Sequence, residues 1–174
     1  QNNLNRKQNR VRVFEIARVF RKDSADQFVQ NERIGGLWYG SVLPEQWGEK
    51  TRNVDFYDMK ADVESLLKNK EVSFVKTEHP ALHPGRAANI FSDGKVVGFV
   101  GELHPKWLQK YDLPQAPLVF EIDMDAVLGR EKTRYQTVSK FQPARRDLAF
   151  VMPEAVTHDD LLNALKAAAN KLVQ

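Results

Sequence analysis

The spacing of apolar and polar residues predicts strands and a helix in the first half of the chain. Residues 11–20 are rich in β-branched and aromatic side chains that fall on both faces of an extended strand, which predicts a strand in the middle of a sheet. Residues 33–43 predict a second strand, whose three glycines let another backbone approach closely. Residues 58–70 have the apolar spacing of an amphipathic helix, and a short strand is predicted around Phe74.

A hairpin, a short helix and another strand are predicted farther along. Within residues 87–103, the dipeptide Asp93-Gly94 lies between two apolar runs, and this is a strong signal for a two-residue hairpin turn. A proline opens the predicted helix over residues 105–111, because proline is tolerated in the first turn. Residues 117–124 alternate apolar and polar side chains, which predicts a strand with one solvated face.

The last part of the chain predicts a separate unit. A polar run leads into a predicted strand over residues 146–152, and Thr157 is placed to cap a helix with a wide apolar side. One strand and one helix cannot bury enough apolar surface to offset their own ordering entropy. The unit therefore either docks on the preceding domain or is the opening of a second, incomplete domain, and we favour the second interpretation.

The composition of the 174-residue chain excludes several kinds of chemistry. It has no cysteine, which excludes disulfides, thiolate zinc sites, iron–sulfur clusters and a cysteine nucleophile. No apolar run approaches about 18 residues, so we expect no membrane span. The first ten residues lack the apolar core of a signal peptide, which predicts a cytoplasmic protein. They also lack an initiator Met, so we expect the chain to be part of a longer one.

The charge is distributed unevenly along the chain. Residues 1–22 carry seven basic side chains and one acidic one, and residues 130–174 carry eight basic and five acidic ones. The segment between them has an acidic excess. Basic ends can serve nucleic acid, although a solvated surface explains them as well, whereas the acidic middle is a poor surface for nucleic acid.

Three histidines and three carboxylates are candidate metal ligands. His79, His83 and His104 could ligate zinc, but each precedes a proline, which favours turn histidines that bond to the backbone. The carboxylates Glu121, Asp123 and Asp125 share one face if their strand continues, and they could hold magnesium or calcium or could simply be solvated. The common signatures for a serine nucleophile or a phosphate loop are missing. From the residues alone, the sequence therefore predicts a soluble α+β domain with a basic appendage, and no reaction.

Six blocks of sequence, taken together, carry a specific resemblance. In chain order they are FEIARVF (14–20), VDFYDMKADVESLL (54–67), LHPGRAANI (82–90), VGFVGELHP (97–105), VFEIDMDAVL (119–128) and SKFQPARRDLAFV (139–151). They resemble the C-terminal part of the bacterial phenylalanyl-tRNA synthetase beta subunit. That family forms an α2β2 heterotetramer, which charges tRNA with phenylalanine at the expense of ATP.

The resemblance implies an α+β fold and a division into four parts. Residues 1–8 look like the tail of a long helix, and residues 9–129 look like most of a catalytic-like domain. That domain is built on the antiparallel sheet of class II synthetases, with flanking helices, but is inactive. Residues 130–139 would be a linker. Residues 140–174 would be the first strand and helix of a truncated ferredoxin-fold anticodon-binding domain.

We expect no ATP site in this chain. The run FRKD at residues 20–23 is similar to the Phe-Arg-x-Glu signature of active class II synthetases, so Arg21 is either a remnant phosphate clamp or a surface arginine. The later segment lacks the glycine-rich strand of the active enzymes, and it places Glu121, Asp123 and Asp125 where a polyanion would lie. Like charges ~4 Å apart repel by about 4 kcal/mol at an effective dielectric near 20. The fragment is therefore expected to bind no cofactor, whereas the intact enzyme uses ATP and magnesium through its alpha subunit.

An inactive domain of this kind is suited to serve as a binding surface. The resemblance implies that it packs against the alpha subunit. The candidate interface residues are the aromatics Trp38, Tyr39, Trp47, Phe56, Tyr57 and Trp107. Trp and Tyr often anchor interfaces, but each of these side chains could equally lie in the core of the domain.

For tRNA, the resemblance points to three positions in the last block. They are Lys140, Arg145 and Arg146, and arginine is suited to bidentate contact with phosphate. Arg146 could instead pair with a nearby carboxylate. Two other readings stay open: a class II-like adenylating enzyme that uses Arg21 with magnesium on the acidic strand, and a stand-alone RNA-binding module. We expect no membrane or DNA partner.

Overall fold

The computed structural model describes residues 2–22, 24–68, 70–128, 135, 140, 142 and 147–168. The chain divides into two compact units, Gln1–Arg134 and Tyr135–Gln174. The division falls within residues 130–139, which the sequence predicts to be a linker. The assignment of residues 140–174 to an anticodon-binding domain stays a prediction.

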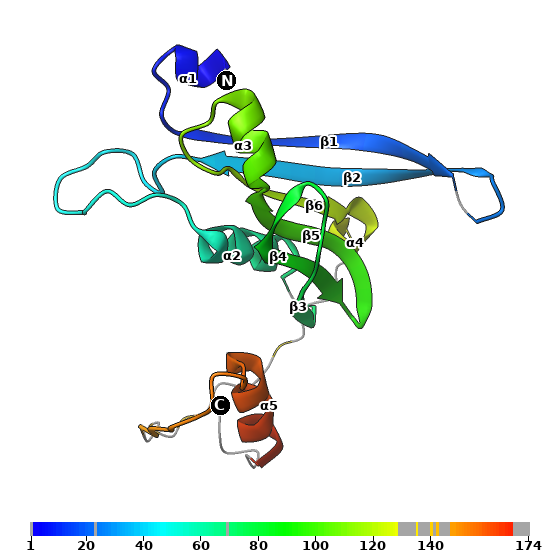
Figure 1. Ribbon diagram of the computed structural model, residues 1–174. Coiled ribbons are helices and arrows are strands. Elements are labelled where there is room, and N and C mark those ends of the chain that lie inside the picture. The colour runs from blue at the N-terminus through cyan, green and yellow to red at the C-terminus, as the bar shows by residue number, and fades with distance from the viewer. Residues whose placement is uncertain are drawn as a thin grey trace. The chain divides into compact units, whose positions relative to one another are not determined.

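A six-stranded sheet forms the centre of the first unit (Figure 1). In spatial order the strands are β1 (Val11–Lys22), β2 (Phe28–Tyr39), β6 (Leu118–Asp123), β5 (Lys95–Leu103), β4 (Leu82–Ser92) and β3 (Val72–Lys76). Each strand pairs antiparallel with its neighbours. The helices of the unit are α1 (Asn2–Asn5), α2 (Phe56–Leu66), α3 (Pro105–Tyr111) and α4 (Met124–Leu128). The predicted α+β fold with an antiparallel sheet is therefore confirmed.

The central strands and α2 form the hydrophobic core. Met59, Val63 and Leu67 of the α2 segment are almost completely buried, as the apolar spacing of the sequence predicts. They join a buried cluster that includes Ile90, Val100, Leu118, Phe120 and Ile122. Every second residue of β6 is buried in this cluster, which confirms the predicted alternation.

Helix α2 begins two residues earlier than the sequence predicts, because Asp55 caps it. The Asp55 side chain accepts hydrogen bonds from the backbone N–H groups of Tyr57 and Asp58, and the Asp58 carboxylate accepts one from the N–H of Asp55. Two hydrogen bonds from Arg52, both of 2.7 Å, hold the pKa of Asp58 below its ordinary value. The helix ends at Leu66, and Lys70 lies beyond it with its ammonium bonded to the Ala126 carbonyl at 2.6 Å.

The predicted hairpin and short helix are confirmed. Strands β4 and β5 are joined by Asp93 (φ 51°) and Gly94 (φ 75°), and two positive φ angles in succession are the requirement of a type I′ turn. Helix α3 runs over the predicted residues, with Pro105 in its first turn and His104 as its N-cap.

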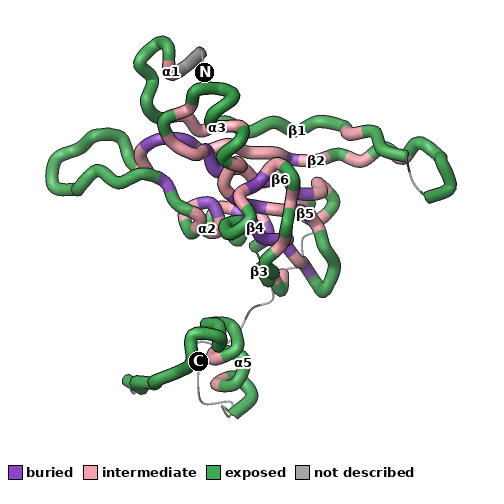
Figure 2. Tube along the Cα trace, in the orientation of Figure 1, coloured by how far each residue is buried: buried purple, intermediate pink, exposed green. Residues whose placement is uncertain are grey.

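The position of β1 corrects one prediction. The sequence places this strand in the middle of a sheet, but it lies at the edge, with β2 as its neighbour (Figure 1). Apolar residues on both faces of a strand indicate that both faces can be covered. They do not indicate how many strands pair with it. Figure 2 shows β1 as exposed along most of its length, because α2 packs against β5 and β6 instead.

Strand β2 also differs from its predicted range of 33–43. It starts at Phe28, since β1 pairs with it at every position from Val11 opposite Tyr39 to Lys22 opposite Phe28. It ends at Tyr39 because Gly40 turns the chain with a φ of +88°.

In the second unit, α5 (His158–Ala168) begins where the sequence predicts. The Thr157 hydroxyl accepts a hydrogen bond from the N–H of Asp160, and the Asp160 carboxylate accepts from the N–H of Thr157, so the predicted cap is confirmed. The strand predicted over 146–152 is not found in its described part, residues 147–152. A strand is held by hydrogen bonds to a neighbour, and no described residue of this unit belongs to a strand that could supply them.

Candidate functional site

The acidic strand β6 meets a basic residue of β2 that the sequence analysis missed. The β2–β6 register places Arg33 opposite Asp123 and Gly35 opposite Glu121. One guanidinium nitrogen of Arg33 lies 2.5 Å from the Glu121 carboxylate, and its Nε lies 2.9 Å from Asp123. Burial alone would lower the pKa of Arg33, but the hydrogen bond to Glu121 and the two negative charges outweigh it and raise the pKa. Arg33 is therefore charged and holds both carboxylates.

This arrangement corrects the prediction that three carboxylates share one face of a strand. Strand β6 ends at Asp123, and Met124 starts α4, so Asp125 lies on a helix and not on the strand. The remaining two carboxylates share Arg33 instead of facing solvent as uncompensated charges. Within the described ranges, no group of three or more His, Cys, Asp or Glu side chains is placed to hold a metal ion.

All three histidines bond to the backbone, as one of the two interpretations expects, although His83 lies at the start of β4 and not in a turn. In each of them Nδ1 accepts a hydrogen bond from the backbone N–H two residues on, at distances of 3.0–3.2 Å. His79 also stacks on Phe99, with 4.5 Å between the ring centroids. Each side chain thus stabilises the backbone just after it.

Arg21 lies apart from the acidic pair. It is opposite Val29, whereas Arg33 is opposite Ala17, four positions along the same strand. At about 3.3 Å per residue this is a separation of roughly 13 Å along β1. Asp23, the last residue of the FRKD run, is outside the described residues. The structure therefore does not bring Arg21 together with Glu121 and Asp123.

The six candidate interface aromatics divide into two groups. Tyr39 is buried, which raises the pKa of its phenol, and Trp38 and Phe56 pack against the core cluster. Trp107 is partly buried and stacks on Tyr111. The other two are on the surface, and they are Trp47, fully exposed at 103%, and Tyr57, 74% exposed. Only these last two are fully available to a partner.

A larger apolar surface lies on β1 and β2, and the sequence analysis did not single it out. Phe14 is opposite Gly36 and Ile16 is opposite Ile34, while Gly36 and Ile34 are in turn opposite the core residues Phe120 and Ile122. Residues directly opposite each other in a sheet point to the same face. Phe14 and Ile16 therefore continue the face that carries the core.

Two further phenylalanines extend this face along the hairpin. Phe20 is opposite Gln30 and Phe28 is opposite Lys22. Phe14, Phe20 and Phe28 are 73%, 69% and 76% exposed. We call Phe14, Ile16, Phe20 and Phe28 the open core face. The signal for it in the sequence is the apolar pattern on both faces of residues 11–20.

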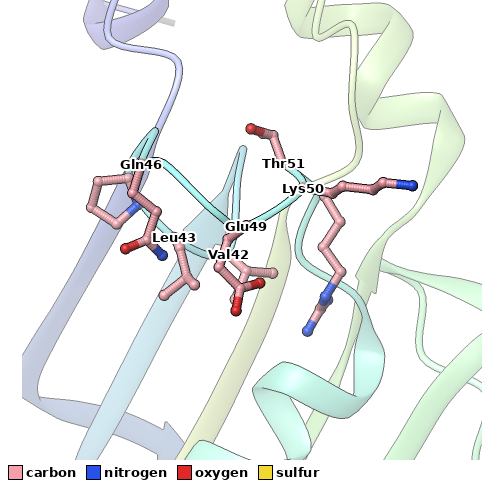
Figure 3. A pocket seen from close by; sticks show the side chains of 8 residues that line it. Val42, Leu43, Gln46, Glu49, Lys50 and Thr51 are labelled. Carbon is pink, nitrogen blue, oxygen red and sulfur yellow. The ribbon is translucent and has the colours of Figure 1, made fainter.

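A small pocket lies in the loop that joins β2 to α2 (Figure 3). It has a volume of about 160 Å³ and is lined by Val42, Leu43, Pro44, Gln46, Glu49, Lys50, Thr51 and Arg52. Its lining is apolar at Val42, Leu43 and Pro44 and polar at the other five residues, and it contains no nucleophile with a neighbouring base.

The three positions matched to tRNA contact are only partly described. Lys140 is exposed, and Arg145 and Arg146 lie outside the described residues. Among the described helices, none is both long and apolar enough to cross a lipid bilayer.

Comparisons with known proteins agree on one family. The sequence model described as "Phenylalanyl tRNA synthetase beta chain CLM domain" matches residues 1–124. The "Phenylalanine--tRNA ligase beta subunit" of Neisseria meningitidis serogroup B is 84% identical over 174 residues, which is 100% of this chain and 22% of that protein. The protein of the same name from Chromobacterium violaceum is 51% identical over 171 residues, covering 98% of this chain and 22% of its own length.

The chain thus spans about a fifth of the length of the curated relatives that it matches. The family match extends over all six strands of the sheet. The chain belongs to the phenylalanyl-tRNA synthetase beta chain family.

Proposed function

We propose that this chain is a non-catalytic, interface-forming segment of the beta chain of a phenylalanine–tRNA ligase, with a class II-like sheet. The whole enzyme is a cytoplasmic α2β2 ligase that charges tRNA with phenylalanine, and its alpha subunit carries the chemistry with ATP and magnesium. The observation that carries the proposal is the open core face, a row of exposed apolar side chains that continues the core onto β1 and β2.

The surroundings of the open core face favour a protein partner. Arg18 and Glu32 lie on this same face between Ile16 and Phe20, and they form an ion pair at 3.3 Å, while Lys22, opposite Phe28, pairs with Asp26 at 2.7 Å. Protein interfaces combine apolar side chains with polar contacts. An RNA surface would need cations that are free to neutralise phosphates, and these two are already paired. The arrangement therefore supports docking of the alpha subunit over a stand-alone RNA-binding module.

The opposite face of the sheet supports the non-catalytic part of the proposal. Transfer of an adenylyl group depends on cations that stabilise developing negative charge. Here Arg33 is committed to Glu121 and Asp123, and Arg21 lies roughly 13 Å along the strand from that cluster. These contacts favour an inactive sheet over the adenylating alternative.

The proposed interface is tested with charged substitutions in the full-length beta chain. Phe14→Asp combined with Phe20→Asp is expected to weaken association with the alpha subunit at least about tenfold, because it buries two carboxylates in an apolar contact. Sedimentation velocity over a concentration series measures the dissociation constant. Val96→Asp is the matched control, since Val96 is an exposed apolar residue near the start of β5 and is not part of the open core face. An unchanged dissociation constant for the double variant would refute the interface.

We further propose that the C-terminal unit contacts tRNA through Lys140, Arg145 and Arg146. Charge reversal in Arg145→Glu with Arg146→Glu is expected to weaken tRNA charging by the assembled enzyme and to leave phenylalanine activation unaltered. If these groups touch single-stranded phosphates, the log of affinity should depend on the log of salt concentration with a slope of roughly −0.7 per contact. Aminoacylation kinetics at several salt concentrations measure both effects. A wild-type KM for tRNA together with a wild-type salt slope contradicts this assignment.

A further inference from the structure

The loop between β2 and α2 is held firmly at its base. This loop, residues 41–53, projects away from the sheet as the cyan loop in Figure 1. Ser41 pairs with Asn53, and the N–H of Val42 donates to the Arg52 carbonyl at 3.0 Å. The N–H of Val54 donates to the Gly40 carbonyl at 2.9 Å. These bonds close the loop at its two ends.

Residues from the start of the chain reinforce this base. The guanidiniums of Arg10 and Arg12 both donate to the Val42 carbonyl, the former at 3.2 Å. Arg12 also lies over the Trp38 ring, 3.5 Å from its centroid. At Gly40 a Cβ atom would overlap the Asn9 carbonyl oxygen, so glycine is required for the close approach of the two segments. The loop is thus anchored from two parts of the chain.

The tip of the loop does not bury its largest apolar side chain. Trp47 is fully exposed, and Leu43 is 46% exposed. The hollow inside the loop is lined by other residues of the loop, and Trp47 is not among them (Figure 3). Tryptophan contributes most when its large ring is removed from water, so an anchored loop that presents one outward is suited to binding.

The charges of the loop indicate what kind of partner it fits. Glu45 and Glu49 balance Lys50 and Arg52, and the Arg52 guanidinium is already held by Asp58. A site for RNA needs an excess of free cations beside its aromatic groups, and an anionic membrane surface needs the same. A neutral tip with an exposed indole fits an apolar pocket on another protein.

We propose that the 41–53 loop is a docking element whose Trp47 side chain inserts into an apolar, indole-sized pocket of the alpha subunit. The proposal rests on the proposed function, because it takes the alpha subunit as the partner. A loop that is fixed at its base loses little conformational entropy on binding. Most of the free energy gained by the contact at its tip therefore contributes to the affinity.

The test uses the full-length beta chain and the alpha subunit. Trp47→Ala is expected to raise the dissociation constant of the two subunits about tenfold, and Trp47→Phe is expected to raise it less, because a phenyl ring fills part of the pocket. Val96→Ala is the matched control for loss of an exposed apolar side chain. Since Trp47 has no buried surface to lose, the variant chain should fold normally, which circular dichroism checks.

The outcomes separate this inference from the proposed function. A dissociation constant for Trp47→Ala within twofold of the wild-type value overturns the docking loop, while a loss of affinity in the Phe14 and Phe20 double variant would still uphold the interface. If the wild-type subunits do not associate, both fail. A loss of tRNA binding with normal subunit association also overturns the inference, in favour of base stacking by the indole.

Discussion

Gly98→Ala is expected to lower the free energy of unfolding of this chain by about 3 kcal/mol, the upper end of the usual cost of overpacking. Gly98 is a buried residue of β5 opposite Ile122 on β6. A Cβ atom at this position would overlap the carbonyl oxygen of Glu121, and it would lie 2.9 Å from the Cα of Ile122. Both are backbone atoms of the neighbouring strand, so only a separation of β5 from β6 could relieve the overlap.

Gly85→Ala is the matched control for this substitution. At Gly85 an added Cβ would meet only the His83 ring, at 3.6 Å, which is ordinary contact, and the φ angle there is not positive. Such a change is expected to be neutral or to stabilise by about 0.4–1 kcal/mol, because it restricts the unfolded chain. Urea denaturation followed by circular dichroism measures both variants. Equal midpoints for the two would show that β5 and β6 do not approach as closely as described.

Arg33→Met is expected to cost about 2 kcal/mol of stability, because it leaves Glu121 and Asp123 side by side without a cation. The cost is below that of a fully buried pair, since the side chains of Arg33, Glu121 and Asp123 are 23%, 36% and 32% exposed. The same denaturation experiment measures it. Arg18→Met is the control, as it breaks an exposed pair with Glu32 and should cost less than about 0.5 kcal/mol.

A second set of variants separates charge from packing at this cluster. Glu121→Gln with Asp123→Asn removes the two negative charges and keeps the shapes of the side chains. Added to Arg33→Met, these changes should restore most of the lost stability, because no uncompensated charge is left. If the triple variant is as unstable as Arg33→Met alone, Arg33 acts through packing of its stem and not through its charge.

Features determined by neighbouring residues could be predicted from the sequence. The turn at Asp93 and Gly94, the start of α3 at Pro105 and the Thr157 cap depend on backbone preferences of one or two residues, and all are found. The alternation of β6 and the apolar stripe of α2 depend on short-range periodicity, and both are found in the structure. Exact element ends were less predictable, because caps and pairing partners move them by several residues.

The candidate sites depended more on residues far apart in the chain. Of the six predicted interface aromatics, Tyr39 is in the core and Trp47 is on the surface, although the sequence offered both as candidates for either place. A periodic pattern states that a face is apolar, but not which neighbour covers it. For the same reason the open core face is not evident from the sequence, because the apolar pattern around Phe14 and Phe20 predicts a strand enclosed within the sheet.

The sequence by itself determined the six strands of the sheet, the main helix, the turns and the family, because each depends on local spacing or on blocks of residues in a fixed order. Only the tertiary structure placed β1 at the edge and brought Arg33 to Glu121, 88 residues away along the chain. Strand order and register are set by many long-range contacts acting together. Local backbone preferences therefore do not determine them.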